Sequence, residues 1–133
     1  MKGLADTGFL VAFANRNDRF HDWAVSVASD ATAPLLTCEP VLAETAFHLR
    51  SVQITLDMIR TGLIELAFDC NDHLVPLAAL AQRYADRKPD LADLCLVRMS
   101  ELHPRHSVVT VDRHDFRVYR RNKRDSIPLI CPP

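Results

Sequence analysis

Short apolar runs recur along the chain and are separated by longer segments in which apolar residues have helical spacing. Each run is rich in aliphatic or β-branched residues and ends near a polar or turn-forming residue, as is typical of buried strands. The runs predict strands at Gly3–Asp6, Pro34–Thr37, Leu63–Phe68, Ser107–Val111 and Ile127–Ile130, the last of which would suit an edge of a sheet.

The segments between these strands favour helices. Pro40 suits the first turn of one helix, and Gly62 suits the end of the next. With Thr7 as the N-cap of the first, helices are predicted at Gly8–Ala14, His21–Ser29, Glu39–Arg50, Ile54–Thr61, His73–Tyr84 and Asp90–Leu102, followed by a short helical turn at His114–Tyr119. Alternating strands and helices indicate an α/β fold with three layers (α/β/α) and a central parallel sheet of about four to five strands. Ligands of such sheets bind beyond the carboxyl ends of the strands.

Composition narrows the class of protein. The 133 residues, 48% of them hydrophobic, suffice for one ordinary core, so we expect a single domain over residues 1–133. A net charge of −1 argues against a polybasic nucleic-acid coat or a protein of the membrane surface. Because Asp6 interrupts the first apolar run, and no run approaches the ~20 residues of a membrane span, we expect a cytoplasmic location.

The four cysteines stand far apart, at positions 38, 70, 95 and 131, and form no C-x-x-C pair. In a chain with an adequate core, this pattern favours reduced thiols over a disulfide framework. The six histidines do not stand at zinc-ligand spacing from any cysteine pair, so the sequence does not favour a zinc site.

Four acidic residues occupy positions that suggest chemistry. Asp6 and Asp112 each close a strand run, whereas Asp93 and Glu44 lie within helices among mostly apolar neighbours. A partly buried carboxylate needs an arginine, several hydrogen-bond donors or a metal. Considered singly, Asp6 and Asp112 are also good helix caps or turn formers, and Glu44 could pair with Arg50.

Two further acids extend this set. Asp90 precedes Asp93 by three positions and Asp115 follows Asp112 by three, so each pair can share a helical face. Carboxylates that converge on one cleft repel one another unless divalent cations are present. Hard cations such as Mg²⁺ take oxygen ligands, and one or two of them can activate water for in-line attack on a phosphodiester. The sequence therefore predicts a metal site.

Five segments resemble a known family: Leu4–Ala12, Asn17–His21, Glu39–Thr45, Leu91–Val97 and Val109–Phe116. In this order, and over nearly the whole length, they resemble the PIN-domain nucleases and, among these, the VapC-type toxins of type II toxin–antitoxin systems. The resemblance implies an endoribonuclease that cleaves RNA by metal-activated water with Mg²⁺ or Mn²⁺ as cofactor. It also implies a homodimer and a cognate antitoxin protein whose peptide covers the cleft.

The family's catalytic metal ligands carry over to Asp6, Glu44, Asp93 and Asp112, with Asp115 as a further candidate ligand. Asp90 could replace or assist Asp93. The resemblance favours Asp93, because the family's acid heads a D-A-x-L-x-A-like helix that Asp93-Leu94-Cys95-Leu96 matches better. By the same resemblance, Thr7 and Thr110 would support the site through hydroxyl hydrogen bonds to ligands or water, although an N-cap and a strand residue are ordinary roles for them.

A basic segment follows the last acidic positions. It contains four candidate RNA-binding residues, Arg113, Arg117, Arg120 and Arg121, which can hold a phosphate backbone. Phe116 and Tyr119 could stack on unpaired bases. On the first loop, Asn15, Arg16 and Arg19 could also line the cleft. A solvated face that balances the acids is an equally good interpretation of the basic segment.

Other classes of protein also place acids at strand ends. A haloacid-dehalogenase-type phosphatase needs an Asp two positions after Asp6, where this chain has Gly8. A receiver-like domain needs a lysine after its fifth strand, but the lysines here stand at positions 2, 88 and 123. Within the family, the alternative to a toxin is a stand-alone RNA-processing nuclease. A non-catalytic RNA- or protein-binding module with a degenerate site would lack some of the acids, yet all four positions are filled.

Overall fold

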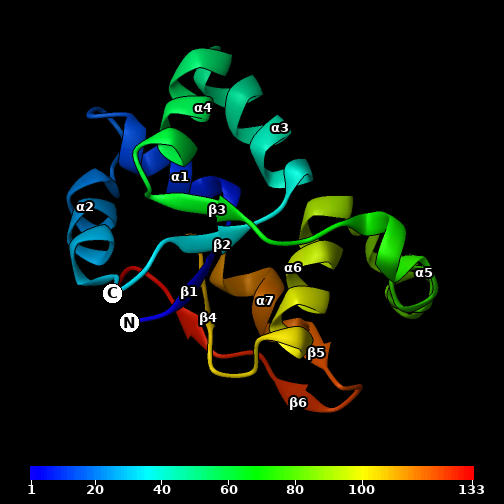
Figure 1. The fold of residues 1–133 in the computed structure, drawn as a ribbon. Coiled ribbons are helices and arrows are strands. Elements are labelled where there is room, and N and C mark those ends of the chain that lie inside the picture. The colour runs from blue at the N-terminus through cyan, green and yellow to red at the C-terminus, as the bar shows by residue number, and fades with distance from the viewer.

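Five short parallel strands form the central sheet of the computed structural model, which describes residues 1–133 (Figure 1). The strands are β1 (Gly3–Ala5), β2 (Leu35–Thr37), β3 (Ile64–Leu66), β4 (Ser107–Val109) and β7 (Leu129–Ile130). Their order is β3-β2-β1-β4-β7, so β1 lies in the middle of the sheet. Leu4 pairs with Leu36 of β2 on one side and with Val108 of β4 on the other.

Seven α-helices flank the sheet, which confirms the predicted three-layer α/β/α class. They are α1 (Thr7–Ala14), α2 (His21–Asp30), α3 (Glu39–Leu49), α4 (Val52–Arg60), α5 (Leu74–Arg83), α6 (Leu91–Leu102) and α7 (Arg113–Val118), and the 3₁₀ helices η1 (Cys70–His73) and η2 (Ala85–Arg87) precede α5 and α6. Helix α1 packs against α2 and α3, whereas α6 packs against both β1 and β4. None of the helices combines the length and the apolar character that crossing a membrane requires.

An aspartate N-cap sets the start of two helices, and each of the two begins one residue away from the predicted position. Thr7 is not the N-cap of α1: the Asp6 carboxylate accepts a hydrogen bond from the Thr7 N–H at 2.7 Å, and the helix starts at Thr7. Asp90 is likewise the N-cap of α6 and not its first residue, since its carboxylate accepts from the Asp93 N–H at 2.8 Å. A short aspartate satisfies these free amide groups well.

The sequence did not predict the antiparallel hairpin formed by β5 (Arg120–Arg121) and β6 (Asp125–Ser126). Its turn holds Asn122 and Lys123 at positive φ, of 51° and 71°, a conformation that is uncommon for lysine. The Asn122 N–H donates to the Glu101 carboxylate at 2.6 Å, which ties the turn to α6. Part of the basic segment is therefore built into the fold.

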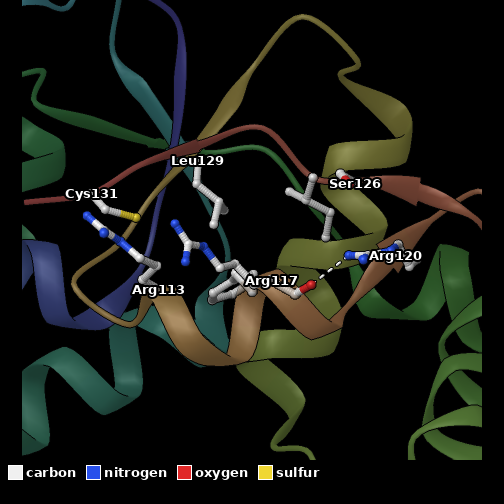
Figure 2. Close-up of a pocket in the computed structure, with 8 residues that line it drawn as sticks. Arg113, Arg117, Arg120, Ser126, Leu129 and Cys131 are labelled. Carbon is white, nitrogen blue, oxygen red and sulfur yellow. Dashed lines mark hydrogen bonds between the residues drawn. The ribbon is translucent and has the colours of Figure 1, made fainter.

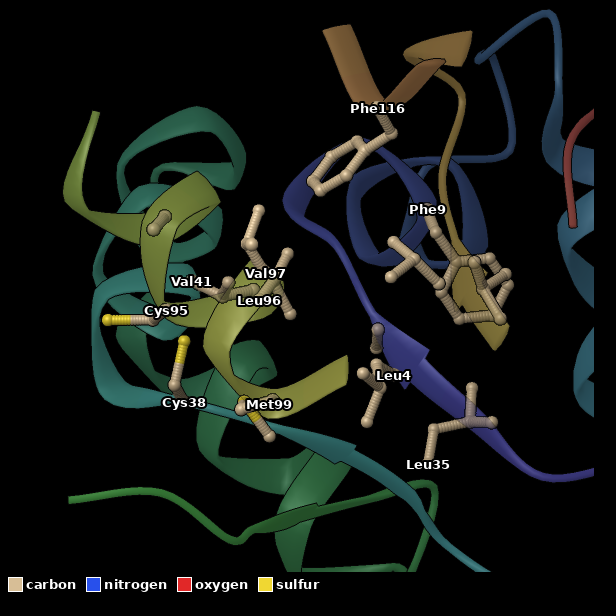
Figure 3. Packing of buried hydrophobic residues seen from close by; sticks show 14 of the residues in the cluster. Leu4, Phe9, Leu35, Cys38, Val41, Cys95, Leu96, Val97, Met99 and Phe116 are labelled. Atoms are coloured by element: carbon tan, nitrogen blue, oxygen red, sulfur yellow. The ribbon is translucent and has the colours of Figure 1, made fainter. Parts of the chain in front are cut away.

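The hydrophobic core surrounds β1 and fixes where this strand ends. Leu4 of β1, Phe9 of α1 and Leu96 of α6 are fully buried in it (Figure 3). At Gly8, a Cβ would lie 2.4 Å from the Val111 side chain, so the first turn of α1 approaches the segment after β4 closely. This contact holds the residues that follow β1 beside those that follow β4.

Candidate active site

One pocket at the carboxyl ends of β1 and β4 is lined mainly by acids, and we call it the acid pocket. Its volume is about 450 Å³. Its lining includes all six acids named from the sequence: Asp6, Glu44, Asp90, Asp93, Asp112 and Asp115. They come from the end of β1, the middle of α3, and the starts of α6 and α7. Segments that are distant in the sequence thus bring their carboxylates to one place.

Three of these acids begin helices that start at the acid pocket. Besides Asp6 and Asp90, Asp112 is an N-cap, and its carboxylate accepts from the Asp115 N–H at 3.2 Å. Free N–H groups and the helix dipole both favour negative charge at such a position. The capping role that the sequence suggested for Asp6 and Asp112 is therefore compatible with a place in the site.

Threonine hydroxyls orient two of the carboxylates. The Thr7 hydroxyl donates to Glu44 Oε1 at 2.8 Å, and the Thr110 hydroxyl donates to Asp6 Oδ2 at 2.6 Å. The Thr110 oxygen also accepts from the Asp112 N–H at 2.9 Å. Thr110 therefore links the acid after β1 to the acid after β4, and it is fully buried.

Burial and mutual repulsion raise the pKa values of the deepest acids. The pKa of Asp93 rises to about 8, first because the carboxyl group is buried and then because Asp90 and Asp6 are close. Burial raises the pKa of Asp6 to about 6 against the opposing effect of the Thr110 hydrogen bond. Burial also raises the pKa of Asp112. Near neutral pH, the metal-free site thus keeps a proton on Asp93, and this proton offsets charge that a bound cation could also offset.

The donor chemistry of the acid pocket fits a hard divalent cation. It offers carboxylate oxygens from several elements and no cysteine. No three His, Cys, Asp or Glu side chains are grouped closely enough to hold an ion in this arrangement. Binding would therefore have to draw some of the carboxylates inward, and this is compatible with the exposed Asp90 and Asp112.

Three polar or aromatic residues in the lining were not among the predicted site residues. Asp18 adds a seventh carboxylate, His48 lies one turn after Glu44 on α3, and Phe20 joins them from the first loop. Arg19 is the only lysine or arginine in the lining, and its guanidinium carbon lies 4.5 Å from the centre of the Phe20 ring. Helical spacing from Glu44 is a signal that could have identified His48.

The predicted arginines lie at a different pocket. Arg113, Arg117 and Arg120 line a pocket of about 710 Å³ together with residues of β7, and we call it the arginine pocket (Figure 2). Helix α7 contributes to both pockets, because Asp115 lines the acid pocket whereas Arg117 lines the arginine pocket. The basic segment is thus separate from the acids that it follows in sequence.

Most of these arginines have backbone partners. Arg113 donates to the Pro132 carbonyl, and Arg120 Nη1 donates to the Arg117 carbonyl at 2.6 Å (Figure 2). Arg121 does not line the arginine pocket and donates to the Ser100 and Pro104 carbonyls. Among these four arginines, only Arg117 has a guanidinium group that donates no hydrogen bond within the protein.

The stacking role expected of Phe116 and Tyr119 is wrong. Phe116 is 1% exposed and Tyr119 is 2% exposed, so neither ring can receive a base. The two rings pack edge to face, and the Tyr119 hydroxyl donates to Asp93 Oδ2 at 3.4 Å. Tyr119 therefore contacts the acid pocket from within the core. Of the loop residues Asn15, Arg16 and Arg19, only Arg19 lines that pocket.

Comparison with known proteins bears on both the family and the fold of the chain. A family model described as PIN domain matches residues 4–122. Among solved structures, the chain is similar to one in the crystal structure of VapBC2 from Rickettsia felis bound to a DNA fragment from their promoter, with a TM-score of 0.61, 15% sequence identity and coverage of 100% of both chains. At this identity, the similarity concerns the fold. No match was found among curated proteins.

The raised pKa values predict how the stability of the metal-free protein depends on pH. Between about pH 4 and pH 8, the native state holds protons on Asp93 that an ordinary aspartate in the unfolded state has lost. The free energy of unfolding should therefore fall as the pH rises through this range. Asp6 contributes in the same direction between about pH 4 and pH 6.

Urea denaturation in EDTA at a series of pH values measures this dependence. Asp93→Asn should be more stable than wild type at pH 8. Between pH 6 and pH 8, its free energy of unfolding should also change less steeply with pH, by an amount that corresponds to up to one bound proton. Between pH 4 and pH 6, a slope from Asp6 should remain. Parallel curves for wild type and variant would show that Asp93 titrates like an exposed aspartate.

Proposed function

Because the chain belongs to the PIN-domain family, we propose that it is a metal-dependent endoribonuclease and the toxin of a toxin–antitoxin pair. Proteins of this family are generally nucleases that depend on divalent metals. The observation that carries the proposal is the acid pocket. Carboxylates from β1, α3, α6 and α7 line a single pocket that contains only one arginine.

Asp6, Glu44, Asp93 and Asp112 are the proposed metal ligands and catalytic residues, with Asp90 and Asp115 as supporting acids. When bound, Mg²⁺ or Mn²⁺ supplies Lewis-acid chemistry, since it lowers the pKa of water and offsets the charge of a phosphodiester. Thr110 holds Asp6 through its hydroxyl, and Thr7 holds Glu44 in the same way. Hydrogen bonds of this kind, to a carboxylate that could bind a metal, restrict the direction in which its oxygen atoms point.

Asp93 is a better candidate for a primary ligand than Asp90. Asp93 is half-buried among other carboxylates, and burial and their repulsion raise its pKa, so a bound cation would favour its ionised form. Asp90 is exposed, and its carboxylate caps α6. The N-terminus of a helix stabilises a capping carboxylate without a metal. We therefore assign Asp90 a supporting part.

Arginines at two places would hold the RNA. Arg19 is suited to the phosphate next to the cleaved bond, because it is the one lysine or arginine in the lining of the acid pocket and stands over the Phe20 ring. Arg117, whose guanidinium is free, would hold a more distant phosphate at the arginine pocket. Arg113, Arg120 and Arg121 would add positive charge there, although their side chains also serve the fold.

Exposed apolar residues on α3 and α4 support an antitoxin partner. Phe47 is 78% exposed, and Val52, Ile54 and Leu56 are exposed as well. Clustered apolar residues at a surface are typical of protein–protein contacts. His48 lines both the acid pocket and a second pocket beside Phe47. An antitoxin peptide bound on α3 could thus continue into the acid pocket and cover it.

The similar structure, a VapBC complex, comes from a toxin–antitoxin pair and agrees with this proposal. We also propose a homodimer. Leu74 and Val75 at the start of α5 are 60% and 82% exposed and offer an apolar surface apart from α3 and α4.

Cleavage of single-stranded RNA in Mn²⁺ by a pair of aspartate variants tests the function. Asp93→Asn should reduce the rate to below about 1% of wild type, because a lost catalytic ligand removes transition-state stabilisation. Asp90→Asn should keep a few per cent or more, because asparagine still caps α6 and the proposed primary ligand, Asp93, is intact. Asp86→Asn, at an exposed acid of η2 outside the acid pocket, is the matched control.

The control should cleave at the wild-type rate. No cleavage by wild type, on any RNA and with either metal, would reject the nuclease proposal. Full activity of Asp93→Asn beside an inactive Asp90→Asn would instead place the primary ligand one turn earlier on α6.

Salt dependence tests the part assigned to Arg117. In the Asp93→Asn background, which prevents cleavage, affinity for single-stranded RNA should fall as salt rises. In a plot of the logarithm of the binding constant against the logarithm of the salt concentration, Arg117→Ala should reduce the steepness of the slope by about 0.7, the value for one phosphate contact on a single strand. The melting temperature should stay unchanged. Arg60→Ala on α4 removes the same charge elsewhere and should not alter the slope. Equal slopes for wild type and Arg117→Ala would assign Arg117 to the solvated surface.

A further inference from the structure

Two cysteines that are separated by 25 positions in the sequence are in contact in the fold. Cys70 Sγ, at the start of η1, lies 3.5 Å from Cys95 Sγ on α6. Cys38, the N-cap of α3, points its sulfur towards α6 (Figure 3). This cluster could not be predicted from the sequence, because the three residues share no motif.

Cys70 and Cys95 differ in their access to solvent. Cys95 is fully buried, whereas Cys70 is half-buried and lines a pocket of about 340 Å³ between α3 and the end of β3. Glu39, Pro40 and Phe68 are among the other residues of that pocket. A small solute that enters this pocket therefore meets Cys70, whose sulfur lies 3.5 Å from that of Cys95.

We propose that Cys70 and Cys95 are a reversible redox pair that a peroxide converts into a disulfide. The Cys70 sulfur attacks one oxygen of hydrogen peroxide and breaks the O–O bond, which gives Cys70–SOH and one water. The Cys95 sulfur then attacks the Cys70 sulfur, which forms the S–S bond and releases a second water with the proton from Cys95. Two thiols are oxidised and one peroxide is reduced; a dithiol reductant reverses the change.

The geometry favours this pair over the other thiols. A disulfide requires the two sulfur atoms to approach by about 1.5 Å, to a bond length of about 2.05 Å, and Cys70 lies on a short 3₁₀ helix at the surface. Cys38 is fully buried, so a peroxide does not reach it first. Cys131 lines the arginine pocket and contacts none of the other three sulfurs. The cluster does not group three ligands closely enough for a metal ion.

Mass spectrometry of the oxidised protein tests the pair. The reduced protein, which has four free thiols, is treated with a slight excess of hydrogen peroxide, blocked with iodoacetamide and digested. The expected product is a peptide pair joined through Cys70 and Cys95, with loss of two thiols that dithiothreitol restores. Cys131→Ser, at a half-buried cysteine outside the cluster, should form the same link.

Two further variants separate the steps. In Cys95→Ala, Cys70–SOH should persist and react with dimedone, whereas in Cys70→Ser the fully buried Cys38 and Cys95 should not be oxidised by the same peroxide dose. If Cys95→Ala does not fold, the peptide map of the oxidised wild type still shows whether Cys70 and Cys95 are linked. Oxidation of Cys70 to a sulfinic acid beside an intact Cys95 thiol, a Cys38–Cys95 link, or only links between molecules would overturn the proposal. None of these outcomes depends on nuclease activity.

Discussion

Repulsion among its carboxylates is the main constraint on the acid pocket, because the fold must offset it. Seven acidic side chains line one pocket of about 450 Å³, and one arginine stands among them. The protein offsets part of this charge with the N-termini of α1, α6 and α7, with the hydroxyls of Thr7 and Thr110, and with protonation of Asp93. Ordinary folding would not gather so many acids without a compensating ligand. A divalent cation would complete the compensation and would use the same oxygens.

The order of the strands makes this gathering possible. Because β1 lies between β2 and β4, the residues after β1 and after β4 reach the same edge of the sheet. Thr110 then joins the two ends through its bonds to Asp6 and Asp112. Helix α6 packs on both strands and presents Asp93 beside them. The position of each acid thus follows from the topology and the core.

Much of the acid pocket could be predicted because strand ends and helical spacing are local signals. Asp6 and Asp112 close strand runs, and Asp90 and Asp93 stand one turn apart on a helix. These patterns indicate from the sequence alone that the carboxylates lie close together. The exact first residue of a helix is harder to predict from the sequence. At Asp6 and Thr7, two good capping residues are adjacent, and only the observed hydrogen bond decides between them.

Side-chain direction and contacts between distant segments could not be predicted in the same way. On α7, neighbouring residues face different pockets, so closeness in sequence did not place Arg113 or Arg117 beside the acids. The burial of Tyr119 depends on its packing against Tyr84 and Phe116. The contact between Cys70 and Cys95 depends on how η1 rests on α6. Each of these features is set by tertiary packing.

Calorimetric titration of Mn²⁺ into the metal-free protein at pH 7, in two buffers with different ionisation enthalpies, tests the central claim directly. If the acid pocket binds the metal, the wild type should bind it and release about one proton, because Asp93 with a pKa of about 8 must ionise to become a ligand. A variant carrying Asp6→Asn, Glu44→Gln, Asp93→Asn and Asp112→Asn should show neither binding nor proton release. Binding of equal affinity in that variant, or wild-type binding with no proton release, would contradict the account.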